Sequence, residues 1–169
     1  MPMRQAQRIL GIDPGLRLTG YGLVELVDGA LEPTLVEGGV IRLNVKASIA
    51  ERLRQLDEEL NELLERTRPT RVVVEKLYAH YKHPRTAILM GHARGVILLG
   101  ATRRDLPVED IPSTEVKKAL TGYGHASKDQ MQRAVAAQFN LAAPPSPPDV
   151  ADALAIALTC ARRLAVARL

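Results

Sequence analysis

The sequence predicts a single α/β domain, residues 1–169, built on a five-stranded mixed sheet with helices on both faces. Three observations support this prediction. A chain of 169 residues is long enough for one domain with a real hydrophobic core and too short for two ordinary ones. Short apolar runs of strand length open the sequence. Beyond about residue 48, longer segments with apolar residues at helical spacing alternate with further short runs.

The opening segments predict three antiparallel strands. Residues 8–13 form a short apolar run that stops at Pro14-Gly15, which is typical of a mostly buried strand. Residues 19–27 and 31–41 are further strand candidates. Asp28-Gly29 between them indicates a hairpin, because both residue types tolerate positive φ.

The pattern then changes to that of an amphipathic helix. The predicted apolar face of this helix consists of Ile49, Leu53, Leu56, Leu60, Leu63 and Leu64. Ser48 with Glu51 forms a capping box at its start, and Pro69 lies beyond its end. Residues 71–75 follow as an apolar, β-branched run typical of a central strand covered on both faces.

The middle of the chain predicts a second helix, from Pro84 to about Arg104. Its small residues Gly91, Ala93 and Gly95 permit close packing against another helix, which a second subunit could supply.

The last third is predicted to be largely helical. Residues 106–111 form a fifth strand candidate, and a short helix at 116–120 is interrupted by glycines. A second capping box at Ser127 starts a helix that runs to about Phe139. A proline-rich connector leads to the final helix, which begins near Pro148.

Four carboxylates occupy positions where chemistry could use them. Asp13 ends the first strand and Glu75 ends the fourth, and a right-handed crossover would bring both to one edge of the sheet. Asp149 and Asp152 project from one face of the first turn of the last helix. Like charges in such a cluster must take up protons or bind a cation, and all-oxygen ligands suit Mg²⁺ or Mn²⁺. Each carboxylate alone also fits a turn, a strand exit or a helix start.

The amino-acid composition limits the kinds of partner and of site that this protein can have. The net charge of +4 and the pI near 9.5 are consistent with a polyanionic partner. The single Cys160 excludes an internal disulfide framework and a cysteine-based zinc site. The first residues lack the apolar segment of a signal peptide, and no apolar run approaches the roughly 18 residues of a membrane span. We therefore expect a cytoplasmic protein with no membrane partner.

The ordered motifs resemble the RuvC family of Holliday-junction resolvases. They are Gly-Ile-Asp-Pro-Gly at 11–15, Thr-Gly-Tyr-Gly at 19–22, Val74-Glu75, His-Ala-Arg-Gly at 92–95 and Asp-Val-Ala-Asp-Ala-Leu-Ala-Ile-Ala at 149–157. The resemblance extends from about residue 8 to residue 161. The Asp-Pro-Gly element alone is weakly specific, whereas the ordered set is strongly so.

The resemblance implies a ribonuclease-H-like fold, a homodimer and a Mg²⁺-dependent endodeoxyribonuclease of DNA recombination and repair. Such an enzyme makes paired symmetric nicks in four-way junction DNA and leaves 5′-phosphate and 3′-hydroxyl ends. By resemblance, Asp13 would bridge two Mg²⁺ ions, for which Mn²⁺ can substitute. Glu75 would be the second ligand, and Asp149 and Asp152 the final pair, although some members have histidine at the position of Asp149. A RuvA–RuvB branch-migration complex is the implied partner.

Further residues are candidates for DNA binding. By resemblance, Tyr78 would stack on a base at the junction, and Lys117 and Lys128 would lie near the scissile phosphate. Residues 78–85 mix basic and aromatic side chains beside Glu75, so that Lys82 and Arg85 are candidates for phosphate contacts. Ordinary solvated side chains would also explain these residues.

Three other functions fit parts of the sequence. A phosphotransferase of the actin and sugar-kinase superfamily also begins with a strand and an Asp, but it needs a second such domain. A non-catalytic DNA-binding module could use residues 116–139 as a helix-turn-helix, although the intervening segment is long and the carboxylates stay unexplained. A nuclease of the same fold could instead act on RNA in a hybrid duplex or on another replication intermediate.

Overall fold

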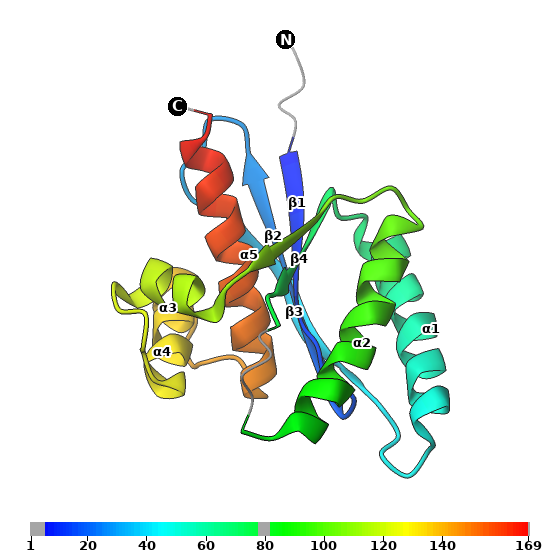
Figure 1. Ribbon diagram of the computed structural model, residues 1–169. Helices are drawn as coiled ribbons and strands as arrows, with labels where there is room; N and C mark the ends of the chain where they lie inside the picture. Colours follow the sequence, from blue (N-terminus) through cyan, green and yellow to red (C-terminus); the bar gives the residue numbers. More distant parts are fainter. Residues whose placement is uncertain (1–5, 78–81, 169) are drawn as a thin grey trace.

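The computed structural model describes residues 6–77 and 82–168 (Figure 1). Its elements in chain order are β1 (Ala6–Asp13), β2 (Leu18–Val27), β3 (Thr34–Arg42), α1 (Ile49–Thr67), β4 (Arg71–Glu75), α2 (Pro84–Thr102), β5 (Val108–Ile111), α3 (Ser113–Thr121), α4 (Lys128–Gln138) and α5 (Pro148–Val166). Every helix and strand expected from the sequence is present among these residues.

The strands form one five-stranded sheet in the order β3-β2-β1-β4-β5. β2 is antiparallel to both β1 and β3, whereas β1, β4 and β5 are mutually parallel. The mixed sheet predicted from the sequence is therefore confirmed. Ile12 pairs with Val74 in the parallel register, so the carboxyl ends of β1 and β4 lie side by side.

Helices cover both faces of the sheet. In Figure 1, α1 and α2 lie on one side of the strands, and α3, α4 and α5 lie on the other. Alternation along β1 sends Leu10 and Ile12 into the core beneath α1 and α2, while Ile9 joins the core beneath α5. On β4, Val73 likewise faces α5.

Helix α5 lies unusually close to the centre of the sheet because glycines face it. A Cβ atom on Gly11 would overlap the carbonyl oxygen of Ala153, and one on Gly22 would lie 2.6 Å from Leu154 Cδ2. The α5 backbone therefore rests directly on β1 and β2, where no side chain separates the two layers.

The predicted helix starts are confirmed in detail. Ser48 at the start of α1 accepts a hydrogen bond from the Glu51 amide, and the Glu51 carboxylate accepts one from the Ser48 amide. Ser127 and Gln130 make the same reciprocal pair at the start of α4. Both capping boxes join residues three positions apart, so they depend on the local sequence and not on distant contacts.

Some predicted boundaries were wrong by a few residues. β3 begins at Thr34 instead of residue 31, and β5 begins at Val108 instead of residue 106. In both cases a proline precedes the strand, Pro33 and Pro107, and proline cannot donate a ladder hydrogen bond. The short helix α3 starts at Ser113, three residues earlier than predicted.

The small residues of α2 do not all serve the same contact. Gly100 packs against α1, where a Cβ would lie 2.8 Å from Leu60 Cδ2, and Ala93 is buried. A Cβ on Gly95 would meet no atom of the described residues within 4 Å. Ile88 and Leu99, which are 62% and 48% exposed, lie three turns apart on the same helix.

No helix within residues 6–77 and 82–168 has the length and apolar character needed to cross a membrane.

Candidate active site

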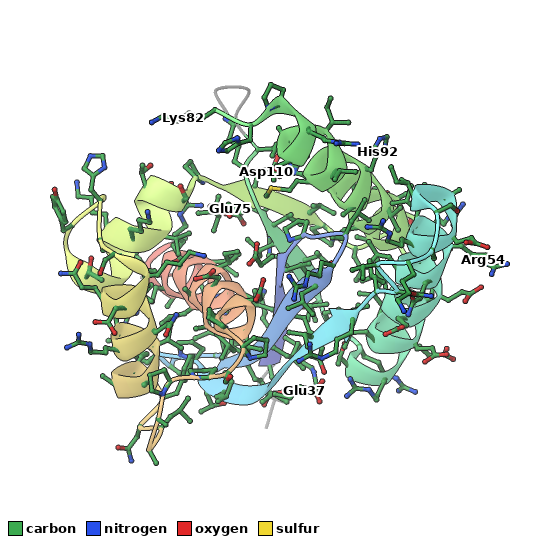
Figure 2. The ribbon with its side chains drawn as sticks, turned by 90° about the horizontal axis from the view of Figure 1, so that it is seen from below. Glu37, Arg54, Glu75, Lys82, His92 and Asp110 are labelled. Carbon is green, nitrogen blue, oxygen red and sulfur yellow. The ribbon has the colours of Figure 1, made fainter. Side chains whose placement is uncertain are left out.

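Two carboxylates reach the α5 side of the sheet by strand alternation. Asp13 follows Gly11 by two residues on β1, and Glu75 follows Val73 by two residues on β4. Gly11 and Val73 both face α5, so Asp13 and Glu75 face it as well. Figure 2 shows Glu75 at the end of β4, on the side occupied by α3 and α5.

The other two carboxylates come from the first turn of α5. The helix begins at Pro148 with Pro147 as its cap, and Val150 and Ala151 are buried against the protein core. Gly20 on β2 leaves room for this turn, because a Cβ there would overlap the carbonyl oxygen of Asp149. This close approach brings Asp149 and Asp152 to the end of β1.

Asp13 lies at the centre of the resulting negative charge. Its pKa is raised to about 8, chiefly by burial and then by the nearby carboxylates of Asp152, Glu75 and Asp149, in that order. The ammonium group of Lys128 acts in the opposite direction. The order of these causes shows that the side chains interact, and that Asp152 interacts with Asp13 more strongly than Asp149 does.

Burial also raises the pKa values of Glu75 and Asp152. For Glu75 the next cause is the charge of Asp152, while Lys117 and a hydrogen bond from the Ser113 hydroxyl lower the pKa. For Asp152 the charge of Lys128 lowers the pKa and that of Asp149 raises it. The two lysines therefore partly compensate the charge of the carboxylates.

Two hollows meet at Asp13. The first, here called the lysine hollow, has a volume of about 290 Å³, and its walls include Glu75, Asp152, Lys117 and Lys128 as well as Asp13. The second, here called the arginine hollow, has a volume of about 450 Å³. Its walls include Asp149, Arg17 and Arg52 in addition to Asp13. Asp149 and Asp152 thus face different hollows although they share one helical turn.

The structure brings together six of the nine residues predicted from the sequence. These are Asp13, Glu75, Asp149, Asp152, Lys117 and Lys128. Lys82 and Arg85 are exposed at the start of α2 and do not line either hollow, and Figure 2 shows Lys82 pointing outward at the rim of the molecule. Tyr78 lies outside the described residues.

Metal-ligand geometry is not preassembled at this site. Among residues 6–77 and 82–168, no three or more His, Cys, Asp or Glu side chains already form a group that could hold a metal ion. The carboxylates interact through their charges, but a ligand set would require their side chains to converge on an ion.

Sequence reasoning missed several residues that shape the site. Ser113 and Arg17 were not singled out, and Gly20 was named only within the Thr-Gly-Tyr-Gly motif without a role, although each contacts or borders the carboxylates. A signal existed for the glycine: Gly20 and Gly22 are two residues apart in β2 and so share one face of the strand, which indicates a face without side chains that allows close packing. Cys160, in contrast, is buried as expected and its pKa is raised to about 12, consistent with an inert thiol.

Comparison with known proteins places this chain in a family. The model of the family described as "Crossover junction endodeoxyribonuclease RuvC" matches residues 9–160. A RuvC of Rhodopirellula baltica is 48% identical over 160 residues, which are 95% of this chain and 88% of that protein. A RuvC of Heliobacterium modesticaldum is 42% identical over 156 residues, or 92% and 94% of the two chains.

Comparison with solved structures leads to the same family. Thermus thermophilus RuvC, in complex with a Holliday junction substrate, superposes with a TM-score of 0.86 at 35% identity and covers 95% of this chain and 96% of that one. The yeast mitochondrial Holliday junction resolvase Ydc2 shares the fold, with a TM-score of 0.64 at 13% identity over 99% and 89% of the chains. The ribonuclease-H-like fold expected for the family is therefore confirmed. This chain belongs to the RuvC family of crossover junction endodeoxyribonucleases, which are metal-dependent nucleases.

Proposed function

We propose that this protein resolves Holliday junctions by hydrolysing DNA at Asp13, Glu75, Asp149 and Asp152. As a RuvC family member it is a junction-resolving endonuclease, and the proposal assigns that activity to these four side chains. The observation that carries the assignment is the environment of Asp13. This buried carboxylate borders both hollows and experiences the charge of three other carboxylates.

The donor set fits hard divalent cations. A carboxylate with a pKa of about 8 holds a proton near neutral pH unless a cation replaces it, so the cluster favours cation binding. All four candidate ligands are carboxylates, which suit Mg²⁺ and also Mn²⁺, and their charge would accommodate two ions per site. When bound, such ions activate a water molecule and stabilise the leaving 3′ oxygen in phosphodiester hydrolysis.

The surrounding residues supply binding and orientation. Lys117 and Lys128 line the lysine hollow beside Glu75 and Asp152, where they would hold the phosphate group through charge-assisted hydrogen bonds. Ser113 donates to Glu75 and thereby orients that carboxylate. The products would be nicks with 5′-phosphate and 3′-hydroxyl ends.

Residues farther from the carboxylates would bind the junction arms. Tyr78 is proposed to stack on an opened base, and Lys82 and Arg85 to contact phosphates by charge. The exposure of Lys82 and Arg85 leaves them free to meet DNA.

Symmetric nicks require two sites, and we propose a homodimer that places one on each of two strands. The exposed face of α2 supports this arrangement, because Ile88 and Leu99 are apolar and Gly95 leaves open space between them. We further propose that the dimer acts in the cytoplasm together with a RuvA–RuvB complex, as membership of the RuvC family implies.

The test compares three labelled substrates: a mobile four-way junction, a linear duplex of the same sequence and an RNA–DNA hybrid. Each is incubated with Mg²⁺, Mn²⁺ or EDTA. We expect paired, symmetric, metal-dependent nicks on the junction alone. Cutting of the hybrid alone would indicate that the substrate is RNA in a hybrid duplex. Tight junction binding without any cutting would favour a non-catalytic DNA-binding module.

A further inference from the structure

The arginine hollow has no assigned role in the reaction. It shares only Asp13 with the lysine hollow, and at about 450 Å³ it is the larger of the two. One wall is the loop that follows Asp13, and the facing wall is the first two turns of α2, including Thr86, Leu89 and Met90. Leucine and methionine side chains give this hollow an apolar wall that suits deoxyribose and base faces.

The two arginines of this hollow differ in what they contact. The Arg52 guanidinium donates to three backbone carbonyls: Leu16 at 3.4 Å, Val45 at 3.2 Å and Ala47 at 3.1 Å. Arg52 therefore ties α1 to the loop after Asp13. The Arg17 side chain is exposed and has no hydrogen bond or ion pair within the described residues.

The loop that carries Arg17 is held in place by its backbone. The Arg17 carbonyl accepts a hydrogen bond from the Leu43 amide at 3.0 Å. The Thr19 hydroxyl donates to the Gly15 carbonyl at 2.8 Å and accepts from the Gly15 amide at 3.1 Å. The loop thus presents Arg17 in the hollow that Asp13 also lines, and the hydrogen bonds that hold the loop do not involve the Arg17 side chain.

We infer that the scissile DNA strand crosses Asp13 from the lysine hollow into the arginine hollow, where Arg17 binds a phosphate adjacent to the one that is cut. The inference rests on the proposed function. Carboxylates repel a DNA strand that passes them, and cations along its path offset this repulsion. Lys117 and Lys128 supply such cations in the lysine hollow, and Arg17 supplies one in the arginine hollow. A planar guanidinium without a protein partner is well suited to bind a phosphate.

The first experiment measures junction binding by fluorescence anisotropy in EDTA across a range of salt concentrations. Arg17→Ala should weaken binding about tenfold near 0.1 M salt and reduce the salt slope by about one, because the variant neutralises one phosphate fewer. Arg17→Lys should restore most of that slope. Arg54→Ala is the matched control, because Arg54 is an exposed arginine on α1 and points outward at the rim of the molecule in Figure 2.

A second experiment identifies the phosphate. Junctions carry a single neutral methylphosphonate, placed in turn at each linkage flanking the cleavage point. Wild type and Arg54→Ala should lose affinity at one adjacent linkage to which Arg17→Ala is insensitive. If Arg17→Ala keeps the wild-type slope and the same response at every linkage, the inference is wrong.

Cleavage assays distinguish a failure of this inference from a failure of the proposed function. In single-turnover assays Arg17→Ala should cut slowly at low protein concentration and reach about the wild-type rate at saturation. If wild type cuts the junction and Arg17→Ala matches Arg54→Ala at every concentration, only the inference fails. If wild type cuts no junction while Arg17→Ala is still insensitive to the methylphosphonate, the proposed function fails and the phosphate contact stands.

Discussion

The two faces of the sheet are built in different ways. Beneath α1 and α2, large aliphatic residues such as Leu10, Ile12 and Leu60 fill the space between the layers. Beneath α5, Gly11 and Gly22 remove side chains from β1 and β2, so the helix backbone touches the sheet. The four candidate catalytic carboxylates all lie on the α5 side.

Because of this difference, one face of the sheet mainly stabilises the fold and the other mainly positions the carboxylates. A core of aliphatic side chains tolerates small shifts of a helix, because the packing can adjust. A helix backbone in direct contact with strand backbone cannot shift without a steric clash. The α5 side therefore fixes the positions of Asp149 and Asp152 relative to Asp13, whereas the opposite side mainly stabilises the fold.

The largest expected effect comes from Asp13→Asn, which tests whether the α5 side contains the chemistry. Removing this carboxylate should lower junction cleavage by at least about 1000-fold, because the candidate metal ligand at the centre of the site is removed. Junction binding in EDTA should persist. Asp28→Asn, a change in the exposed loop after β2, serves as the control in the same assay and should cut normally. Cutting by Asp13→Asn at the wild-type rate would remove Asp13 from the mechanism.

The comparison between the faces is tested directly by one substitution on each. Gly20→Ala would push the first turn of α5 away from β2, and a shift of this kind should cost about 10- to 100-fold in cleavage rate. Leu60→Ala, on α1 in the core of the opposite face, should instead cost about 2–5 kcal/mol of unfolding free energy and leave cleavage unchanged well below the melting temperature. Cleavage rates and chemical denaturation, measured on both variants, test whether the two faces have these different roles. Equal effects of the two substitutions on cleavage would contradict the difference.

Asp13 should also make stability depend on pH. Its pKa is about 8 in the folded protein against an ordinary value of 3.8. Between these values the folded protein retains a proton that the unfolded chain has released, so the stabilisation is present below about pH 4 and is lost as the pH rises toward 8. In EDTA at pH 8, Asp13→Asn should therefore be more stable than wild type, by at most about 5 kcal/mol, the linkage energy of this pKa difference. Thermal unfolding at about pH 5.5 should show a smaller difference, and a constant difference would argue against the raised pKa.

The smallest effect concerns the lysine hollow. Lys117→Ala removes a cation beside Glu75 and Asp152 and should slow cleavage about tenfold. Lys118 is the matched control, since it is exposed on the same helix and lies outside the lining of the hollow. A similar loss in Lys118→Ala would indicate a general effect of charge in place of a phosphate contact.

Much of the fold followed from local patterns. The capping boxes at Ser48 and Ser127 predicted the starts of α1 and α4, and residues 71–75 were correctly predicted as a central strand. Such features depend on neighbours within a few positions in the chain, which a sequence displays directly.

The hairpin prediction was less complete. Gly29 does adopt a positive φ of 84°, but the connection continues to Pro33 before β3 begins.

The sequence by itself determined the element order and the helical spacing of Asp149 and Asp152. It also predicted the parallel pairing that brings Asp13 and Glu75 to one edge, on the condition of a right-handed crossover. Only the tertiary structure decided how closely α5 approaches the sheet, and therefore that Asp149 and Asp152 face different hollows. The physical reason is that this approach depends on glycines from two strands in register, Gly11 opposite Gly22. Strand register is a property of chain pairing, which no single segment of sequence contains.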